Sequence, residues 1–493
     1  MSEAEPQWEK RILSPQATEV YTRPLLASEH WCDQTMLLMD GISQFASGVQ
    51  FTTSIPKDEL EARVKEAVSR LRFECPLVGA TFEAGVHDPD LRSWIYAPVE
   101  NVEQVRSWAD KMVYYLSDSI DPASFLQVLV EKKIPYTLAD GTEQYLRVFV
   151  TRPDGTLNTF CLFLHTSHAI MDAKPSLNVL SLLLEYMSTP GLVDVADLPW
   201  GTEHKNLPPG VVTATGGPHK DWEVHGPAML EKFQAFFVKP KPSHSLACDT
   251  LELRNPGKLQ RFVVTFTAQE SAKIAQALKT LGFTFSELID AATALATLEL
   301  NPIPDNELEG AHIDVGGLIA INDRLPPNID RRRHIVSCMV NAPLAIYYAP
   351  LAKLMGKPRL LAAMKQAKEQ YDDWLANPCL PHLAAELARL APMKTASPPS
   401  RSPFATNVTN VGRVENYIAP VWPRDVKPGE APVFRVEQMH LACRLTWPMP
   451  GIHAWSMQGK LSIQLQAADN WKEDVLRNFV NEVTRQISFV AAE

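Results

Sequence analysis

The chain has 493 residues, of which 45% are hydrophobic and 21% charged, and its formal net charge at pH 7 is −10. This length is enough for two domains with separate cores, and the acidic balance disfavours nucleic acid or an anionic membrane as the main partner. The polar start and the lack of a long apolar run predict a cytoplasmic protein without signal peptide or membrane span. Seven cysteines occur singly, so neither a disulfide framework nor a zinc site is expected.

The first half of the chain begins with a predicted strand region at residues 36–54 and a helix that starts at Pro56. Apolar residues recur at helical spacing between positions 60 and 71, and charges occupy the opposite face. Residues 144–151 and 157–165 predict a hairpin, because a Pro-Asp-Gly turn separates two apolar runs.

The amino-acid composition changes from residue 190 to residue 256. This stretch is rich in proline and glycine, with a possible short helix at 222–237, and it predicts a crossover between two lobes. With a boundary near 240–256, the chain divides into an N-terminal lobe, 1–240, and a C-terminal lobe, 241–493.

Two helices of the second lobe carry explicit start signals. A strand at 261–266 leads to Thr267-Ala-Gln-Glu270, and Thr284-Phe-Ser-Glu287 follows; both strings fit the capping box. Gly282 is placed to end the first of these helices, and the second is apolar nearly all round, which predicts burial. The remaining predicted elements are a strand at 313–321, a helix at 360–376, a Pro/Ser-rich loop at 392–403, a strand at 460–466 and a helix at 472–489.

The stretch from 159 to 172 combines a buried strand with a polar ending. Its apolar run ends in His168 and Asp172, which have the spacing H-x-x-x-D, and helical residues follow. Imidazole titrates near neutrality, so a histidine at a strand-to-helix junction can act as a general base in a cleft. On spacing alone, a histidine held in the core is an equally good interpretation.

The wider string Ser-His-Ala-Ile-Met-Asp-Ala resembles the H-H-x-x-x-D-G signature of the CoA-dependent acyltransferase superfamily. That superfamily includes the condensation domains of peptide synthetases, the plant BAHD acyltransferases and the fungal trichothecene O-acetyltransferases. Ser167 replaces the first histidine and Ala173 replaces the glycine, while the second histidine and the aspartate are both present.

A second resemblance is the strand that ends in Arg324, within Ile-Ala-Ile-Asn-Asp-Arg-Leu-Pro. In condensation domains the arginine at this place pairs with the motif aspartate. The resemblance therefore implies a buried ion pair between Asp172 and Arg324, which would hold the loop so that His168 presents a nitrogen to a channel. The alternative is a solvated loop arginine.

A third resemblance lies in Thr-Asn-Val-Thr-Asn-Val-Gly-Arg at 406–413, which is similar to the S/T-N-x-G strand of the superfamily. It implies that Thr409 and Asn410 line the channel opposite the histidine and can donate a hydrogen bond to an oxyanion, with Gly412 beside them. Ser456 is a weaker candidate for the same channel. A strand with polar, edge-facing residues is the competing interpretation.

Two other groups of residues each allow a functional and a structural interpretation. His165 invites a metal site with His168, but no carboxylate or cysteine completes it, so a core histidine and no metal are expected. The run Arg331-Arg-Arg-His334 could meet the phosphates of CoA, although such a run is more often a solvated loop. The chain contains no G-x-S-x-G, P-loop or G-x-G-x-x-G string, which disfavours serine hydrolases, nucleotide phosphatases and dinucleotide enzymes.

Together the three resemblances imply a mixed α/β fold of two chloramphenicol-acetyltransferase-like lobes with a channel between them. The BAHD string D-F-G-W-G is missing, and Leu-Pro-Trp-Gly at 198–201 is closer to the fungal trichothecene 15-O-acetyltransferase type. We expect a monomeric acyltransferase with acetyl-CoA as co-substrate, a hydroxylated secondary metabolite such as a terpenoid as acceptor, and no bound cofactor. A condensation-type enzyme or cyclase with a carrier-bound donor, and a non-catalytic binding protein, remain alternatives.

Overall fold

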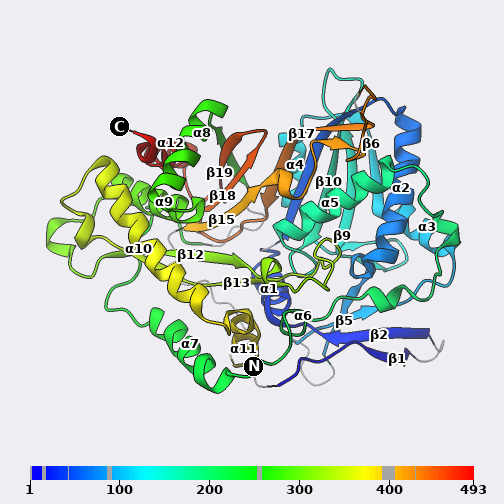
Figure 1. The fold of residues 1–493 in the computed structure, drawn as a ribbon, viewed down its shortest axis with the longest axis horizontal. Coiled ribbons are helices and arrows are strands. Elements are labelled where there is room, and N and C mark those ends of the chain that lie inside the picture. The colour runs from blue at the N-terminus through cyan, green and yellow to red at the C-terminus, as the bar shows by residue number, and fades with distance from the viewer. Residues whose placement is uncertain are drawn as a thin grey trace.

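A computed structural model describes residues 3–13, 18–42, 44–85, 91–252, 258–390, 406–427 and 429–492. Two lobes lie side by side in it, each built on a twisted sheet with helices packed against it (Figure 1). The mixed α/β, two-lobed architecture predicted from the sequence is confirmed. The predicted loop at 392–403 lies outside the described residues.

The first lobe is organised around a six-stranded sheet with the order β16-β17-β3-β10-β9-β6. Its strands are β3 (Gln44–Thr53), β6 (Val113–Ser119), β9 (Leu146–Arg152), β10 (Thr159–Ser167), β16 (Val421–Trp422) and β17 (Phe434–Cys443). β9 and β10 form the predicted hairpin. β10 lies close against β3 at Gly48, where a Cβ atom would stand 2.4 Å from the ring of Phe163.

Helices cover both faces of this sheet. α2 (Lys57–Glu74), which confirms the helix predicted from Pro56, packs with α5 (Ala173–Ser188) on one face, and α4 (Pro122–Glu131) packs on the other. The predicted strand at 36–54 starts late, because α1 (Ala27–Leu38) occupies its first residues. The remaining elements of this region are β1 (Glu9–Leu13), β2 (Thr18–Pro24), β4 (Thr81–Glu83), β5 (Ser93–Tyr96), α3 (Val102–Met112), β7 (Tyr136–Thr137) and β8 (Glu143–Gln144).

The second lobe is built on a seven-stranded sheet with the order β11-β19-β18-β15-β12-β13, in which β14 also pairs with β12. Its strands are β11 (Gln260–Thr265), β12 (His312–Ala320), β13 (Met339–Asn341), β14 (Leu344–Tyr347), β15 (Thr406–Arg413), β18 (Gly451–Met457) and β19 (Lys460–Ala467). Its helices are α8 (Ala268–Leu281), α9 (Phe285–Leu300), α10 (Gly356–Ala376), α11 (Leu383–Leu390) and α12 (Glu473–Ser488). Figure 1 shows α8, α9, α10 and α12 gathered on the outer side of this sheet.

The start and stop signals of the second lobe are confirmed. Thr267 and Thr284 each accept from the backbone N–H three residues on, and the glutamate at that place closes each capping box. Gly282 ends α8 in the left-handed conformation with φ 74°, which costs glycine little. Within the described residues no single helix is long and apolar enough to cross a membrane, although α8 and α9 together, bent by 105°, pass the test of length and composition.

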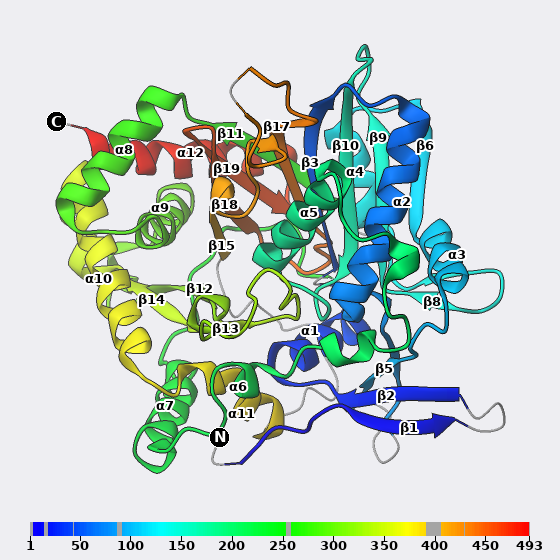
Figure 2. The same cartoon turned by 45° about the vertical axis from the view of Figure 1, so that its right-hand side comes forward.

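The two lobes exchange elements, so no single point divides the chain. β16 and β17 come from the C-terminal half and complete the sheet of the first lobe, beside β3 (Figure 2). In the opposite direction, α6 (Val211–Ala214) and α7 (Trp222–Phe236, the predicted short helix) contribute to the core of the second lobe. Elements on each side of the predicted boundary near 240–256 therefore pack into the lobe on the other side of it.

Candidate active site

The turn that carries the H-x-x-x-D motif is fixed by its own neighbours. β10 ends at Ser167, and the three residues Ala169, Ile170 and Met171 are fully buried in the core of the first lobe. The Ser167 hydroxyl accepts from the Ala169 N–H at 3.3 Å, which tightens the turn. Burial on both sides of His168 leaves its ring little freedom to move.

His168 and Asp172 contact each other directly, whereas the resemblance implied that Asp172 pairs with Arg324. Nδ1 of His168 lies 3.1 Å from Oδ1 of Asp172, and the histidine side chain is 18% exposed. Its ring packs against Phe45 with 4.9 Å between the ring centroids. Because Nδ1 faces the carboxylate, Nε2 is the nitrogen available for proton transfer to a ligand.

The charge state of His168 is set by groups from two elements. Burial works against the imidazolium, but Cys32 of α1 and Asp172 act the other way, and the pKa of His168 lies well above its ordinary value. Burial also raises the pKa of the Cys32 thiol. The site therefore places the His168 imidazole beside the Cys32 sulfur and the Asp172 carboxylate.

Asp172 also joins the two lobes. Its Oδ1 accepts from the Ser337 hydroxyl at 2.7 Å and its Oδ2 from the Cys338 N–H at 2.6 Å, and both donors belong to the segment that leads into β13. The carboxylate is buried, with only 7% of the residue exposed. Hydrogen bonds to a buried charge are among the stronger ones in proteins, so this contact fixes the motif against the second lobe.

The predicted ion pair between Asp172 and Arg324 is wrong. Arg324 donates instead to the Leu375 carbonyl at 3.0 Å, near the end of α10. The last carbonyls of a helix lack partners within the helix and attract cations, while Asp172 already has two donors from residues 337 and 338. The structural role predicted for the arginine is filled by a hydroxyl and a backbone amide.

The predicted channel strand presents its two polar residues to opposite faces of the sheet. Thr409 is paired in parallel register with His453 of β18, and Asn410 with Ala454. Ala454 belongs to the helix-covered core of the second lobe, and the Asn410 amide donates to Ser286 Oγ of α9 at 3.2 Å. Asn410 thus faces α9, whereas Thr409 shares the face of His453.

That face is the one directed to the first lobe. Trp455, two residues after His453 and on the same face, belongs to the core of the first lobe. His453 Nε2 lies 3.6 Å from the Cys443 sulfur at the end of β17. Burial lowers the pKa of His453 to about 4 and raises that of Cys443 to about 11, and His168 acts electrostatically on both. A neutral imidazole and a neutral thiol therefore stand near His168.

Gly412 and Ser456 complete the predicted set. Gly412 has φ +86° and follows a register irregularity after Asn410, whose Oδ1 accepts from the Gly412 N–H at 3.0 Å. Ser456 lies two residues after Ala454, and so on its face of the sheet, away from His453. Of the three strand candidates with side chains, only Thr409 faces the first lobe.

His165 is a core histidine, as expected. It is fully buried, and its Nδ1 lies 2.5 Å from the Tyr136 hydroxyl. Burial lowers the pKa of His165 to about 3, so the ring is neutral. In the described part of the chain, no group of three His, Cys, Asp or Glu side chains could hold a metal ion.

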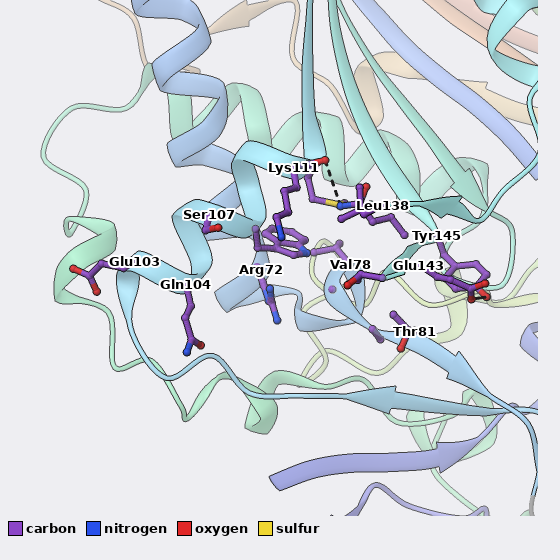
Figure 3. A pocket seen from close by; sticks show the side chains of 16 residues that line it. Arg72, Val78, Thr81, Glu103, Gln104, Ser107, Lys111, Leu138, Glu143 and Tyr145 are labelled. Atoms are coloured by element: carbon purple, nitrogen blue, oxygen red, sulfur yellow. Dashed lines mark hydrogen bonds between the residues drawn. The ribbon is translucent and has the colours of Figure 1, made fainter. Parts of the chain in front are cut away.

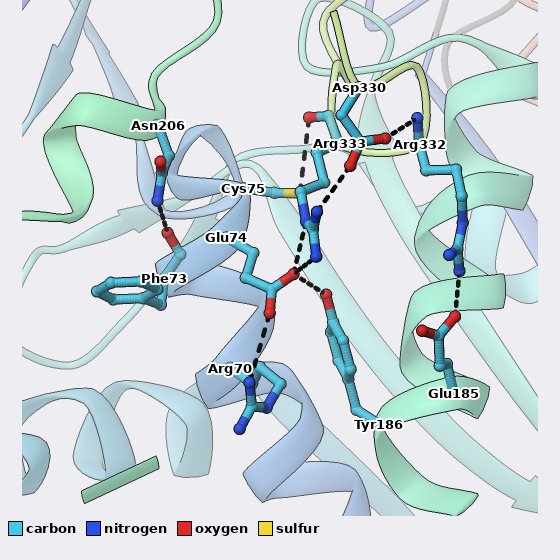
Figure 4. A network of polar contacts seen from close by, with 10 residues as sticks. All are labelled: Arg70, Phe73, Glu74, Cys75, Glu185, Tyr186, Asn206, Asp330, Arg332 and Arg333. Atoms are coloured by element: carbon cyan, nitrogen blue, oxygen red, sulfur yellow. Dashed lines mark hydrogen bonds and ion pairs between the residues drawn. The ribbon is translucent and has the colours of Figure 1, made fainter. Parts of the chain in front are cut away.

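The basic run at 331–334 is engaged in ion pairs within the protein. Arg333 pairs with Glu74 at 2.6 Å and with Asp330 at 2.7 Å, and Arg332 pairs with Glu185 (Figure 4). Glu74 also accepts from the Tyr186 hydroxyl at 2.6 Å. These two arginines tie a loop of the second lobe to α2 and α5, so the run is more than a solvated loop.

Sequence reasoning missed Cys32, Ser337, Cys338, Cys443 and His453. Only His453 carried a usable signal, as a histidine inside an otherwise apolar strand. The others are small residues whose contact with the motif depends on how the lobes dock.

The fold resembles several solved structures at low sequence identity. It matches the TRI3 trichothecene 15-O-acetyltransferase from Fusarium sporotrichioides with a TM-score of 0.80 and 17% identity, over 98% of both chains. It also matches the condensation domain of the monacolin K polyketide synthase MokA, with a TM-score of 0.63 and 13% identity over 96% of this chain and 98% of that one. For the first condensation domain of the CDA synthetase the values are 0.62 and 11%, over 95% and 96%. No family model and no curated protein sequence matches the chain. The chain has the two-lobed fold of these enzymes.

Proposed function

We propose that the protein is an O-acyltransferase that moves an acyl group, in the first place acetyl, from acyl-CoA to a hydroxyl of a secondary metabolite such as a terpenoid. The proposal rests above all on one observation: a partly exposed imidazole is held by a buried carboxylate where two lobes meet. The fold supports it, because a trichothecene 15-O-acetyltransferase is built in the same way.

In the proposed reaction His168 works through Nε2. The neutral ring takes the proton of the acceptor hydroxyl, and the alkoxide oxygen attacks the thioester carbonyl. The imidazolium formed is stabilised by Asp172 at Nδ1, 3.1 Å away. When the tetrahedral intermediate collapses, the carbon–sulfur bond breaks and the imidazolium returns its proton to the CoA thiolate. No covalent intermediate on the enzyme is required.

The oxyanion of the intermediate needs a hydrogen-bond donor on the opposite side of the site. Thr409 is our candidate, because it lies on the same face of the sheet as His453. That face points toward the first lobe, since Trp455 on the same face belongs to the core of that lobe. Asn410, the other residue predicted for this role, has its amide on Ser286 of α9. Of the two candidates that the sequence named in this strand, the register favours Thr409.

A carrier-bound thioester is the second candidate donor. Its support is the shared fold of the condensation domains of MokA and the CDA synthetase. The same histidine chemistry would then act on a thioester of a carrier protein, and no free CoA would appear.

The test is thiol release from acetyl-CoA in the presence of a panel of terpenoid and polyketide alcohols. We expect release that requires an alcohol, a loss of about 10²- to 10⁴-fold in His168→Ala, as is typical for removal of a general base, and no loss in His219→Ala. His219 is a partly exposed histidine of the crossover that is outside the site. Equal rates in wild type and His168→Ala would refute the assignment of the base. No thiol release and no CoA binding by the wild type would favour the carrier-bound donor.

A further inference from the structure

A cavity of about 300 Å³ opens between α1 of the first lobe and the elements β12, β13, α7 and α11. Figure 1 shows these elements meeting below the two sheets, with α1 next to β13. The residues that carry the argument are Trp31, His30, Phe233, Asn341, Leu387 and Ala388, all of which line it.

The cavity adjoins the motif through the backbone on two sides. Cys338, whose N–H binds Asp172, is followed directly by Met339, which lines the cavity and whose N–H contacts the Ser28 hydroxyl at 3.4 Å. On the other side, Trp31 of the lining precedes Cys32, the thiol that acts on His168. Two residues of the lining, Trp31 and Met339, are therefore next in sequence to residues that act on His168 or Asp172.

Among the described residues, the lining is mostly apolar and carries no ionised side chain. Trp31, Phe233 and Leu387 provide apolar surface, and a volume near 300 Å³ is at the lower end for small-molecule sites. An anionic or cationic ligand would lose its hydration in such a site without gaining a partner. The cavity suits a neutral, compact molecule.

Two lining side chains hold a buried polar atom without a hydrogen-bond partner. They are Nε2 of His30, a residue only 5% exposed, and Oδ1 of Asn341. Burial lowers the pKa of His30, so its ring is neutral. A purely hydrocarbon ligand would leave both atoms unpaired, which is costly, whereas a ligand hydroxyl can donate to Asn341 Oδ1 and can donate to or accept from His30 Nε2.

A second large cavity, of about 480 Å³, lies in the first lobe beside α2 and α3 (Figure 3). Its cationic groups are already engaged: the Arg72 guanidinium lies over the Trp108 ring at 4.7 Å, and Lys111 pairs with Asp140 at 3.1 Å. Unlike the cavity beside α1, its lining contains no residue next in sequence to Cys32 or Cys338, and it points to no ligand.

We infer that the cavity between α1 and β13 binds the body of the acceptor: a neutral alcohol with a compact ring skeleton and a second oxygen function that pairs with His30 and Asn341. This inference rests on the proposed function and deepens it. It assigns the apolar wall to the acceptor and not to the acyl chain of the donor, because a simple acyl chain carries no hydroxyl that could donate to Asn341 Oδ1.

The experiment measures binding, which does not depend on turnover. Saturation-transfer NMR in the His168→Ala background would use a bicyclic sesquiterpene diol and the matching mono-ol as probes, with octanoyl-CoA as a third probe. Ala388→Trp fills the cavity, and Leu390→Trp on the same helix is the control, since Leu390 is half exposed and outside the lining. Thermal melts establish that the variants fold.

We expect Ala388→Trp to weaken diol binding at least tenfold and Leu390→Trp to leave it unchanged. Loss of one hydrogen bond to a buried group corresponds to roughly a fivefold to twentyfold loss of affinity. His30→Leu and Asn341→Leu should therefore weaken the diol by about that factor and leave the mono-ol within about twofold. Equal diol affinity in Ala388→Trp, or a cavity-filling effect confined to octanoyl-CoA, would overturn the inference. Diol binding that Ala388→Trp abolishes, in a wild type that releases no thiol, would retain the binding site and reject only the acyltransferase proposal.

Discussion

Asp172→Asn is the substitution that tests both roles of this carboxylate. The charge at 3.1 Å from Nδ1 supports the imidazolium of His168, and the same two oxygens accept from Ser337 and Cys338 of the other lobe. Asparagine keeps the shape but removes the charge and one acceptor. The substitution should therefore change both the titration of His168 and the stability of the docked lobes.

The expected magnitudes follow from the geometry. An opposite charge this close favours the imidazolium, so the raised pKa of His168 should fall in the variant. Asparagine replaces one of the two buried carboxylate oxygens by an NH₂ group, so either the Cys338 N–H or the Ser337 hydroxyl then faces a donor. We expect the free energy of unfolding to drop by about 2–4 kcal/mol.

The pH dependence has a definite sign. Because the pKa of His168 is higher in the folded protein than in the unfolded chain, the group stabilises the fold below about pH 6.5, and this contribution disappears as pH rises through the folded-state pKa. For activity, kcat/KM should rise through that same pKa, since only the neutral ring is a base. In Asp172→Asn the rise should shift to lower pH.

Histidine Cε1–H NMR of the labelled protein would measure this titration directly, with the resonance of His168 identified by its absence in His168→Gln. Asp323→Asn is the control for loss of an acidic group nearby, because Asp323 pairs with Lys174 on the surface and its side chain is 69% exposed. An unchanged titration of His168 in Asp172→Asn would refute the electrostatic reasoning.

Three further predictions concern other parts of the molecule. Asp290→Asn should stabilise the protein by about 2–4 kcal/mol at pH 8 and little at pH 4, because burial raises the pKa of Asp290 to about 7; urea unfolding at both pH values measures this. Arg444→Met should cost about 3–5 kcal/mol in the same assay, since this buried arginine binds a carboxylate and two backbone carbonyls. Thr409→Val should lower kcat about 10²-fold, as loss of an oxyanion donor does, and Asn410→Ala should change it little.

Each of these has a clear contrary result. A stability gain in Asp290→Asn that is equal at both pH values would mean that burial does not shift the titration. A neutral Arg444→Met would show that the end of β17 is not anchored by this residue. Loss of kcat in Asn410→Ala, with Thr409→Val unaffected, would reverse the assignment of faces in β15.

Local sequence signals predicted those parts of the fold that local physics determines. The capping boxes at Thr267 and Thr284 and the stop at Gly282 depend on contacts within four residues, and all three are present. His168 and Asp172 are likewise neighbours across a single turn, and their spacing identified the motif, although the resemblance paired Asp172 with Arg324 and not with His168. Where the interacting groups are close in sequence, residue type and spacing are sufficient.

Contacts made across the lobes were beyond such reasoning. Arg324 is a plausible partner for a buried carboxylate by charge, yet the donors are Ser337 and a backbone amide, which have no recognisable pattern in a sequence. The orientation of Thr409 and Asn410 depends on the parallel register of β15 with β18, and a shift by one residue would exchange their faces. A prediction of the strand therefore could not predict which residue faces the site.

The exchange of strands explains why the candidate site depends on both halves of the chain. β17 comes from the C-terminal half, yet it pairs with β3 and ends at Cys443, beside His453 of the other sheet. Gln464 of the second sheet donates to the Leu441 carbonyl of β17, so a polar side chain of the second sheet binds a strand of the first sheet. The motif at residues 168–172 is thus held in place by residues between 337 and 464. Separating the lobes would remove the donors to Asp172 together with the strand that carries Cys443. Neither half alone can form the site.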